Sequence, residues 1–445
     1  MLGVETFGQY GFALAVFAFF TVISDFGIEN YQTRQTAIFN DKNKARILAA
    51  DSFISRLILS ALSAIIIFVI SVIINKPLPL KIFLWLLSFT MILNCLAGSF
   101  ISILLGYEKF KYFSMLSLST QMAGTMLGIL VLYLGYSLPG IGVTHLITAV
   151  LSAVAIAITA RRVVGGFSLR GKLTKALDII KQSAPLGITA ILITIYYRAD
   201  LIMLSIIKGD QAVGCYNSAY ALVNGLLLVS ATFSSTLLPR MSSYFKREPD
   251  KLDVLYQTGF KYLLFFGMAA AFGAAFLAEP IYRLIYPEAY LPGANALKIL
   301  IWAMAMMFVN TLQNALMIAR DLKKRLMYLT GAGAFVNIIL NLILIPPYGF
   351  AGAALATVAS ELITAAGFII TLRSSLPYRM FASLLWRLLP ALALMVLSIK
   401  FTESVMIIPR ILIGAAVLVV ALVITGGLNR RDFRTLMGLL SWGKD

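Results

Sequence analysis

The stretch LILSALSAIIIFVISVII, residues 57–74, is apolar apart from three serines and contains no charged residue. A transmembrane helix needs about 20 consecutive, mainly apolar residues to cross the hydrocarbon core of a bilayer. Together with the residues just before it, this stretch predicts a membrane-spanning helix over residues 49–74.

Similar apolar stretches recur along the whole chain of 445 residues. Helices are expected because backbone groups in lipid must be satisfied internally, and because these runs lack the alternation of barrel strands. The sequence predicts an all-α integral membrane protein. We expect thirteen spans, at residues 7–28, 49–74, 82–105, 113–134, 141–160, 185–207, 216–238, 260–280, 297–319, 327–345, 349–372, 384–401 and 407–425.

The composition excludes a water-soluble enzyme. Hydrophobic residues make up 60% of the chain and charged residues 13%, against about 45–50% and about 25% in ordinary globular chains. Cys95, Cys215 and the single His145 are too few for a disulfide framework, a thiolate cage or a His-rich site, so no metal or cofactor is expected. There is no GxxxxGK[ST] motif for ATP hydrolysis by that route.

The net charge of +18 reflects membrane topology rather than nucleic-acid binding. Of the 37 Lys and Arg residues, 27 fall in one set of alternate loops and 6 in the opposite set. Loops rich in Lys and Arg face the cytoplasm. We therefore expect a multi-pass protein of the cell membrane whose C-terminus is cytoplasmic and whose Met1 lies outside.

A shift of 206 residues reveals an internal repeat. It places Gly3, Gly8, Tyr10, Ala13 and Arg34 on Gly209, Gly214, Tyr216, Ala219 and Arg240. The second half has a span, 185–207, before this motif, whereas the first half has none. We interpret this as a missing first helix, through a late start codon, a truncation or a real divergence. Six spans per repeat would give the two halves the same orientation in the membrane.

The expected domains follow from the repeat. They are an N-lobe of five spans at 1–165, a basic cytoplasmic linker at 166–184, a C-lobe of six spans at 185–378, and an extra helix pair with a cytoplasmic tail at 379–445.

The segment LGVETFGQY, residues 2–10, resembles the LGxExFGxY signature of polysaccharide repeat-unit (O-antigen type) flippases. These belong to the multidrug/oligosaccharidyl-lipid/polysaccharide exporter superfamily. Residues 197–204, 213–220 and 337–349 are also similar to the family. The resemblance covers essentially the whole chain. It implies two six-helix lobes around a central cavity, fourteen spans, and export of undecaprenyl- or dolichyl-linked sugars; the missing first helix departs from this pattern.

Ionisable side chains within spans cost about 2.5–3.5 kcal/mol on insertion scales and are functional candidates by default. Arg198 and Asp200 lie near the middle of the sixth span on different faces, whereas Tyr196 and Asp200 share a face. A guanidinium binds phosphate oxygens bidentately and stays charged, so Arg198 suits a pyrophosphate. The alternative is an ion pair between helices, with Asp25 or Glu361 as the partner of Arg198.

Other basic side chains have both a functional and an ordinary interpretation. Arg56 lies near the cytoplasmic start of its span, where it either binds a ligand or snorkels to lipid headgroups. Arg34 and its repeat mate Arg240 either capture a diphosphate headgroup or are ordinary cytoplasmic charges. His145 is more typical of a packed or interfacial residue than of a proton relay.

Two carboxylates are candidates for coupling to a proton or sodium ion. Glu361 lies near mid-span with Thr357, Ser360 and Thr364 on one face, and Asp25 is the second candidate.

Polar stripes at helical spacing are candidate sugar contacts, or else they form ordinary hydrogen bonds between membrane helices. They consist of Asn310, Gln313 and Asn314 in one span and of Asn337 and Asn341 in another.

The function predicted from the sequence is flipping of a polyprenyl-diphosphate-linked oligosaccharide from the inner to the outer leaflet for polysaccharide biosynthesis. The expected partners are this glycan, membrane lipids, H⁺ or Na⁺, a polysaccharide polymerase and glycosyltransferases, and no nucleic acid. The first alternative is a multidrug or small-molecule antiporter of the same superfamily. An integral membrane sugar polymerase or ligase is a second alternative, disfavoured because the predicted outer loops are short and hold few acid/base residues.

Overall fold

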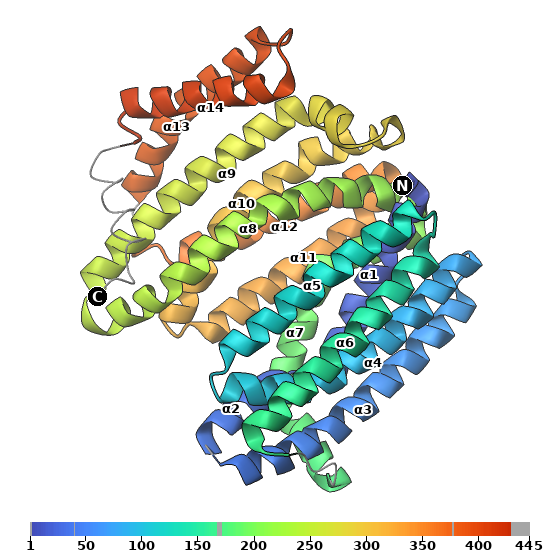
Figure 1. Cartoon of the computed structure of the whole chain (residues 1–445). Coiled ribbons are helices and arrows are strands. Elements are labelled where there is room, and N and C mark those ends of the chain that lie inside the picture. The colour runs from blue at the N-terminus through green and yellow to red at the C-terminus, as the bar shows by residue number, and fades with distance from the viewer. Residues whose placement is uncertain (1, 40, 167–170, 376–377, 429–445) are drawn as a thin grey trace. The chain divides into compact units, whose positions relative to one another are not determined.

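The computed structural model describes residues 2–39, 41–166, 171–375 and 378–428 (Figure 1). Within these ranges the chain is helical and contains no strand. The helices are α1 Val4–Asp25, α2 Ile28–Phe39, α3 Lys42–Ile73, α4 Leu78–Gly106, α5 Phe110–Tyr133, α6 Leu138–Val164, α7 Leu173–Lys208, α8 Asp210–Arg247, α9 Pro249–Ile285, the 3₁₀ helix η1 Glu288–Tyr290, α10 Gly293–Ala319, α11 Lys323–Tyr348, α12 Phe350–Thr371, α13 Tyr378–Phe401 and α14 Ile407–Ile424.

The predicted fold class is confirmed. In the described part of the chain, thirteen helical segments are long and apolar enough to cross a membrane, with α1 and α2 counted as one segment. Three of them are much longer than expected, because α7, α8 and α9 have 36, 38 and 37 residues. At about 1.5 Å per residue these helices exceed a hydrocarbon core of about 30 Å, so their ends extend beyond it.

Helix α7 differs most from the sequence-based expectation. It begins at Leu173 rather than near residue 185, so most of the segment expected to be a linker at 166–184 is helical. The carboxylate of Asp51 in α3 accepts the backbone N–H of Lys172 at 2.7 Å, and Ser55 of α3 donates to the carbonyl of Ala176 at 3.0 Å. These contacts from α3 hold the first turn of α7.

The chain forms two compact units, residues 1–213 and residues 214–445. In the first unit α3 packs on α4, and α6 packs on both α4 and α5. In the second unit α9 packs on α10, and α12 packs on both α10 and α11. These three packing pairs follow the same order along the chain in the two units, as a duplication predicts. Helix α7 packs on α1, α2 and α3 and so belongs to the first unit by its contacts.

The junction between α1 and α2 is a tight turn at Phe26 and Gly27, which both adopt the left-handed conformation with φ of 46° and 76°. A Cβ atom at Gly27 would lie 2.7 Å from the backbone nitrogen of Gly187 in α7, and one at Gly187 would lie 2.6 Å from the carbonyl oxygen of Phe26. Backbone therefore meets backbone at this crossing, which only glycine permits. The turn places Asp25, the last residue of α1, beside α3.

Candidate functional site

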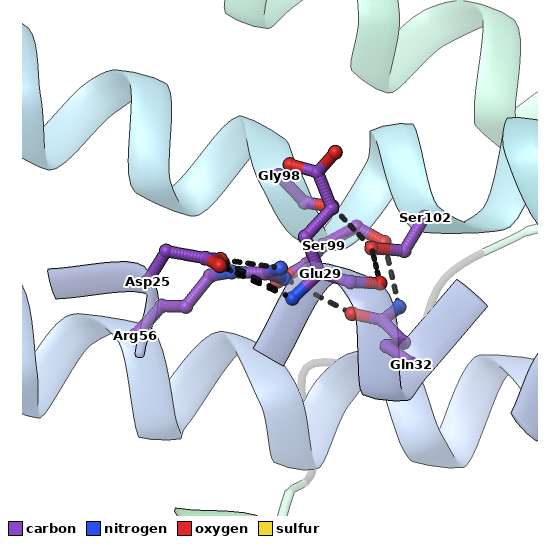
Figure 2. Close-up of polar contacts among 7 residues, drawn as sticks. All are labelled: Asp25, Glu29, Gln32, Arg56, Gly98, Ser99 and Ser102. Carbon is purple, nitrogen blue, oxygen red and sulfur yellow. Dashed lines mark hydrogen bonds and ion pairs between the residues drawn. The ribbon is translucent and has the colours of Figure 1, made fainter. Parts of the chain in front are cut away.

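The side chain of Arg56 lies at the centre of a polar cluster inside the first unit (Figure 2). Its exposed fraction is 0%. Nε and Nη2 each donate to Oδ1 of Asp25 at 3.0 Å. Nη1 donates to Oε1 of Gln32 at 3.0 Å and to Oγ of Ser99 at 2.9 Å. The guanidinium thus joins residues of four helices, α1 to α4.

Two further features hold this guanidinium in place. Gln32 also donates from Nε2 to the carbonyl oxygen of Ser99 at 2.8 Å, which fixes the amide beside the arginine. A Cβ atom at Gly98 would lie 3.2 Å from Cζ of Arg56, so the guanidinium rests against the backbone of α4. Four hydrogen bonds use most of the five N–H donors of the side chain.

The cluster contains one more carboxylate than cation. The backbone N–H of Glu29 donates to Oδ1 of Asp25 at 3.3 Å, while the carboxylate of Glu29 points away from the guanidinium (Figure 2). The side chain of Asp25 is 28% exposed, so its paired carboxylate is not sealed off. With both carboxylates ionised, Asp25, Glu29 and Arg56 together carry a net charge of −1.

The burial of Arg56 bears on one of its two interpretations. Snorkelling is wrong, because a snorkelling side chain keeps its charged head in water or among headgroups, whereas this one is fully buried. A buried charge is tolerated when it is paired and hydrogen-bonded, as here.

A second polar network lies inside the second unit and centres on α12. Glu361 is only 2% exposed, and its Oε2 accepts from Nδ2 of Asn310 in α10 at 2.7 Å. Nδ2 of Asn337 in α11 donates to Oγ of Ser360 at 3.1 Å, and Nδ2 of Asn341 donates to Oδ1 of Asn337 at 2.9 Å. Asn310 of the predicted stripe on α10 and Asn337 of the predicted stripe on α11 thus both contact α12.

The same face of α12 also reaches α8, and two amide oxygens on α10 and α11 lack a hydrogen-bond partner among the described residues. The hydroxyls of Tyr216 and Thr357 lie 3.2 Å apart. The side-chain carbonyl oxygens of Asn310 and Asn341 are buried without a hydrogen-bond partner among the described residues. Each such buried group costs about 1–3 kcal/mol if it stays unsatisfied. Carboxylate and amide oxygens in this setting suit a proton, a water molecule or a small hard cation.

The residues predicted on α7 lie in the first unit. Tyr196 and Asp200 are both buried, which confirms that they share a face, whereas Arg198 is half-buried. Of the two partners considered for Arg198, Asp25 pairs with Arg56 and Glu361 accepts from Asn310.

The remaining predicted residues are more exposed. Arg34 is exposed on α2, and Asn314 is half-buried on α10. His145 is half-buried with its ring centroid 6.4 Å from that of Phe83, so it is a packed residue.

Sequence patterns did not identify Gln32, Ser99 and Glu29, or the ion pair between Lys76 and Asp210. One signal was present: Ile28, Gln32 and Thr36 recur every fourth residue, and all three are buried on one face of α2.

Two family models match this chain. The one described as polysaccharide biosynthesis protein matches residues 1–245, more than half of the chain, and the one described as MatE matches residues 185–343. The chain belongs to the polysaccharide biosynthesis protein family. The resemblance noted in the sequence is thereby confirmed, and the protein is a multi-pass membrane member of this family.

The relative described next is distant from this protein in sequence. An uncharacterised membrane protein of Methanocaldococcus jannaschii is 27% identical over 186 residues, which cover 42% of this chain and 43% of that protein. The chain therefore matches less than half the length of this curated relative.

Two solved structures share the fold. Lipid II flippase MurJ in an inward closed conformation has a TM-score of 0.74 at 17% identity, covering 94% of this chain and 95% of its own. An inward-facing multidrug resistance MATE family transporter of the MOP superfamily has a TM-score of 0.66 at 16% identity, covering 86% and 92%. Both are transport proteins rather than enzymes.

Proposed function

We propose that this protein moves a polyprenyl-diphosphate-linked oligosaccharide from the inner to the outer leaflet of the cell membrane, by alternating access of its two units. The observation that carries the proposal is the match of residues 1–245 to a family defined by polysaccharide biosynthesis. The fold shared with a lipid II flippase supports it, since that protein also handles a lipid-linked substrate.

In this proposal Arg198 binds the diphosphate. It is half-buried in the middle of a spanning helix, where an arginine that is not sealed into a packed core meets water or an anionic ligand. Asp200 and Tyr196, buried on the neighbouring face, hold the helix around it. Arg34, exposed on α2, meets the diphosphate at the cytoplasmic entrance.

Glu361 is the proposed coupling residue. Its buried carboxylate accepts a hydrogen bond from Asn310, and an ionisable group buried within a spanning helix is a candidate for binding a proton or a sodium ion. Asp25 is a second candidate, restrained by its pairing with Arg56.

Export of a small molecule or drug is the competing function. The MatE match over residues 185–343 favours it.

Transport in reconstituted vesicles tests the proposal. We expect vesicles containing the protein to flip a fluorescent polyprenyl-diphosphate oligosaccharide, and Arg198→Ala and Asp200→Asn each to lower the initial rate at least tenfold. Lys208→Ala, an exposed change at the end of the same helix, is the matched control. Unchanged rates in both variants would remove these residues from the mechanism. Efflux of a cationic dye without sugar-lipid flipping would establish the competing function instead.

A further inference from the structure

Helix α5 packs mainly on α6 and buries none of its residues within the described structure. It is nevertheless long and apolar enough to span the membrane. Its exposed surface therefore faces something other than this unit: lipid, water or another protein surface.

The exposed surface of α5 has two chemically different faces. Ser114, Ser117, Gln121 and Thr125 are exposed and follow one another at i, i+3, i+7 and i+11, which places them within an arc of about 80°. We call these four residues the α5 polar stripe. The adjoining face is apolar and exposes Met115, Met122, Met126 and Ile129.

Lipid is a poor environment for the polar stripe. The hydroxyl of Thr125 is satisfied by the carbonyl of Gln121 at 2.9 Å, as a threonine in a lipid-facing helix can be. A glutamine amide has two donors and an acceptor, and a carbonyl of its own helix cannot satisfy all of them. Leaving such a group unsatisfied in hydrocarbon costs several kcal/mol. Gln121 therefore argues against lipid and for a polar environment around the stripe.

The repeat provides an internal comparison, because α11 holds in the second unit the place that α5 holds in the first. In α11 the polar Asn337 and Asn341 are buried, and Asn337 binds Ser360 of α12. The exposed residues of α11 are apolar: Phe335, Ile339, Leu342 and Ile343. A helix at this position can therefore pack with its polar residues buried and its apolar residues exposed. In α5 the polar residues are exposed instead.

We propose that the α5 polar stripe is a wall of the water-filled transport path and contacts the sugar hydroxyls of the transported molecule. The stripe has hydroxyl and amide groups but no charge, which matches neutral sugar hydroxyls rather than an ion. Exposed Lys109 and Lys111 lie at the start of the same helix, where they meet the diphosphate. The contact with sugar rests on the proposed function, whereas the access of water to the stripe does not.

Cysteine labelling of the full chain tests the access of water. Cys95 and Cys215 are buried and can be replaced by serine to give a cysteine-free background. Each stripe residue and each residue of the adjoining apolar face is then changed singly, for example Gln121→Cys and Met122→Cys. A water-soluble, negatively charged thiosulfonate reacts with the thiolate, which forms in water. A maleimide added after denaturation in SDS reports that each variant is present and carries a free thiol.

We expect the thiosulfonate to label the four stripe positions at least tenfold faster than the four apolar positions. Equal rates on the two faces would overturn the inference, whatever the protein transports.

Protection experiments then test the contact with sugar. A polyprenyl-diphosphate oligosaccharide should slow labelling of the Gln121→Cys variant at least threefold, and polyprenyl diphosphate without sugar should not. Fast labelling with no protection would disprove the sugar contact but not the access of water to the stripe. Failure of the proposed function is thereby distinguished from failure of the inference that water reaches the stripe.

Discussion

Lys76 and Asp210 form an ion pair, with Nζ of the lysine 2.5 Å from Oδ1 of the aspartate. Lys76 belongs to the loop between α3 and α4, and Asp210 is the first residue of α8. Ser205, in the last turn of α7, donates to the same oxygen at 2.7 Å. Gly209 between these helices has φ of 84°, and the chain passes into the second unit shortly after it. The ion pair therefore fixes this joint to the first unit.

Lys76→Met should destabilise the protein, because it leaves a carboxylate that is only 6% exposed without its cation. Removing one partner of a buried pair costs about 3–5 kcal/mol in soluble proteins. Thermal unfolding in detergent should show a lower Tm, and adding Asp210→Asn should recover most of the loss. Lys208→Met, at an exposed site nearby, serves as the control. A Tm equal to that of the parent would contradict a stabilising role.

Arg56→Lys should fail to replace the arginine. A lysine ammonium cannot reproduce the planar set of bonds to Asp25, Gln32 and Ser99. We expect a loss of about 3–5 kcal/mol in unfolding free energy, as for other buried charges left without full partners. Arg34→Lys, an exposed change on α2, should have no effect. If denaturant titration gives equal stabilities for Arg56→Lys and the parent, the cluster is not a structural requirement.

Gly27→Ala should weaken the α1–α2 turn for two separable reasons. The residue has a positive φ of 76°, and the new Cβ atom would lie 2.7 Å from the backbone of Gly187. Gly135→Ala has the same backbone problem, with φ of 83°, but no neighbouring atom within 4 Å. The loss of Tm should therefore be larger at Gly27, and the difference between the two variants measures the close approach of α7. Equal losses would mean that backbone conformation alone matters.

Glu361→Gln should uncouple transport without unfolding the protein. The glutamine retains an oxygen that accepts from Asn310, but it can neither release a proton nor contribute charge to a bound cation. We expect uptake driven by a pH or sodium gradient to fall at least tenfold, with Tm within a few degrees of the parent. Thr371→Val, at the end of the same helix, is a control. Gradient-driven transport that persists in Glu361→Gln would exclude this carboxylate as the coupling group.

The candidate site was more predictable from the sequence in the second unit than in the first. Asn310, Asn337, Asn341 and Glu361 were identified because polar residues at helical spacing in an apolar span are visible without a structure. The structure places Asn310 and Asn337 in hydrogen bonds with the neighbouring residues Glu361 and Ser360 of α12, and Asn341 bonds to Asn337. Gln32 was missed because α2 lacks the apolar run of a spanning helix.

The amino-acid sequence by itself determined the membrane spans, the all-helical class and the repeat, because hydropathy and periodicity are properties of consecutive residues. Tertiary structure alone decided that Arg56 pairs with Asp25 and that α7 begins at Leu173 against α3. The partners of Arg56 come from α1, α2 and α4, and no local pattern states which helices will meet. A buried charge must find a counterpart, but helix packing determines which one.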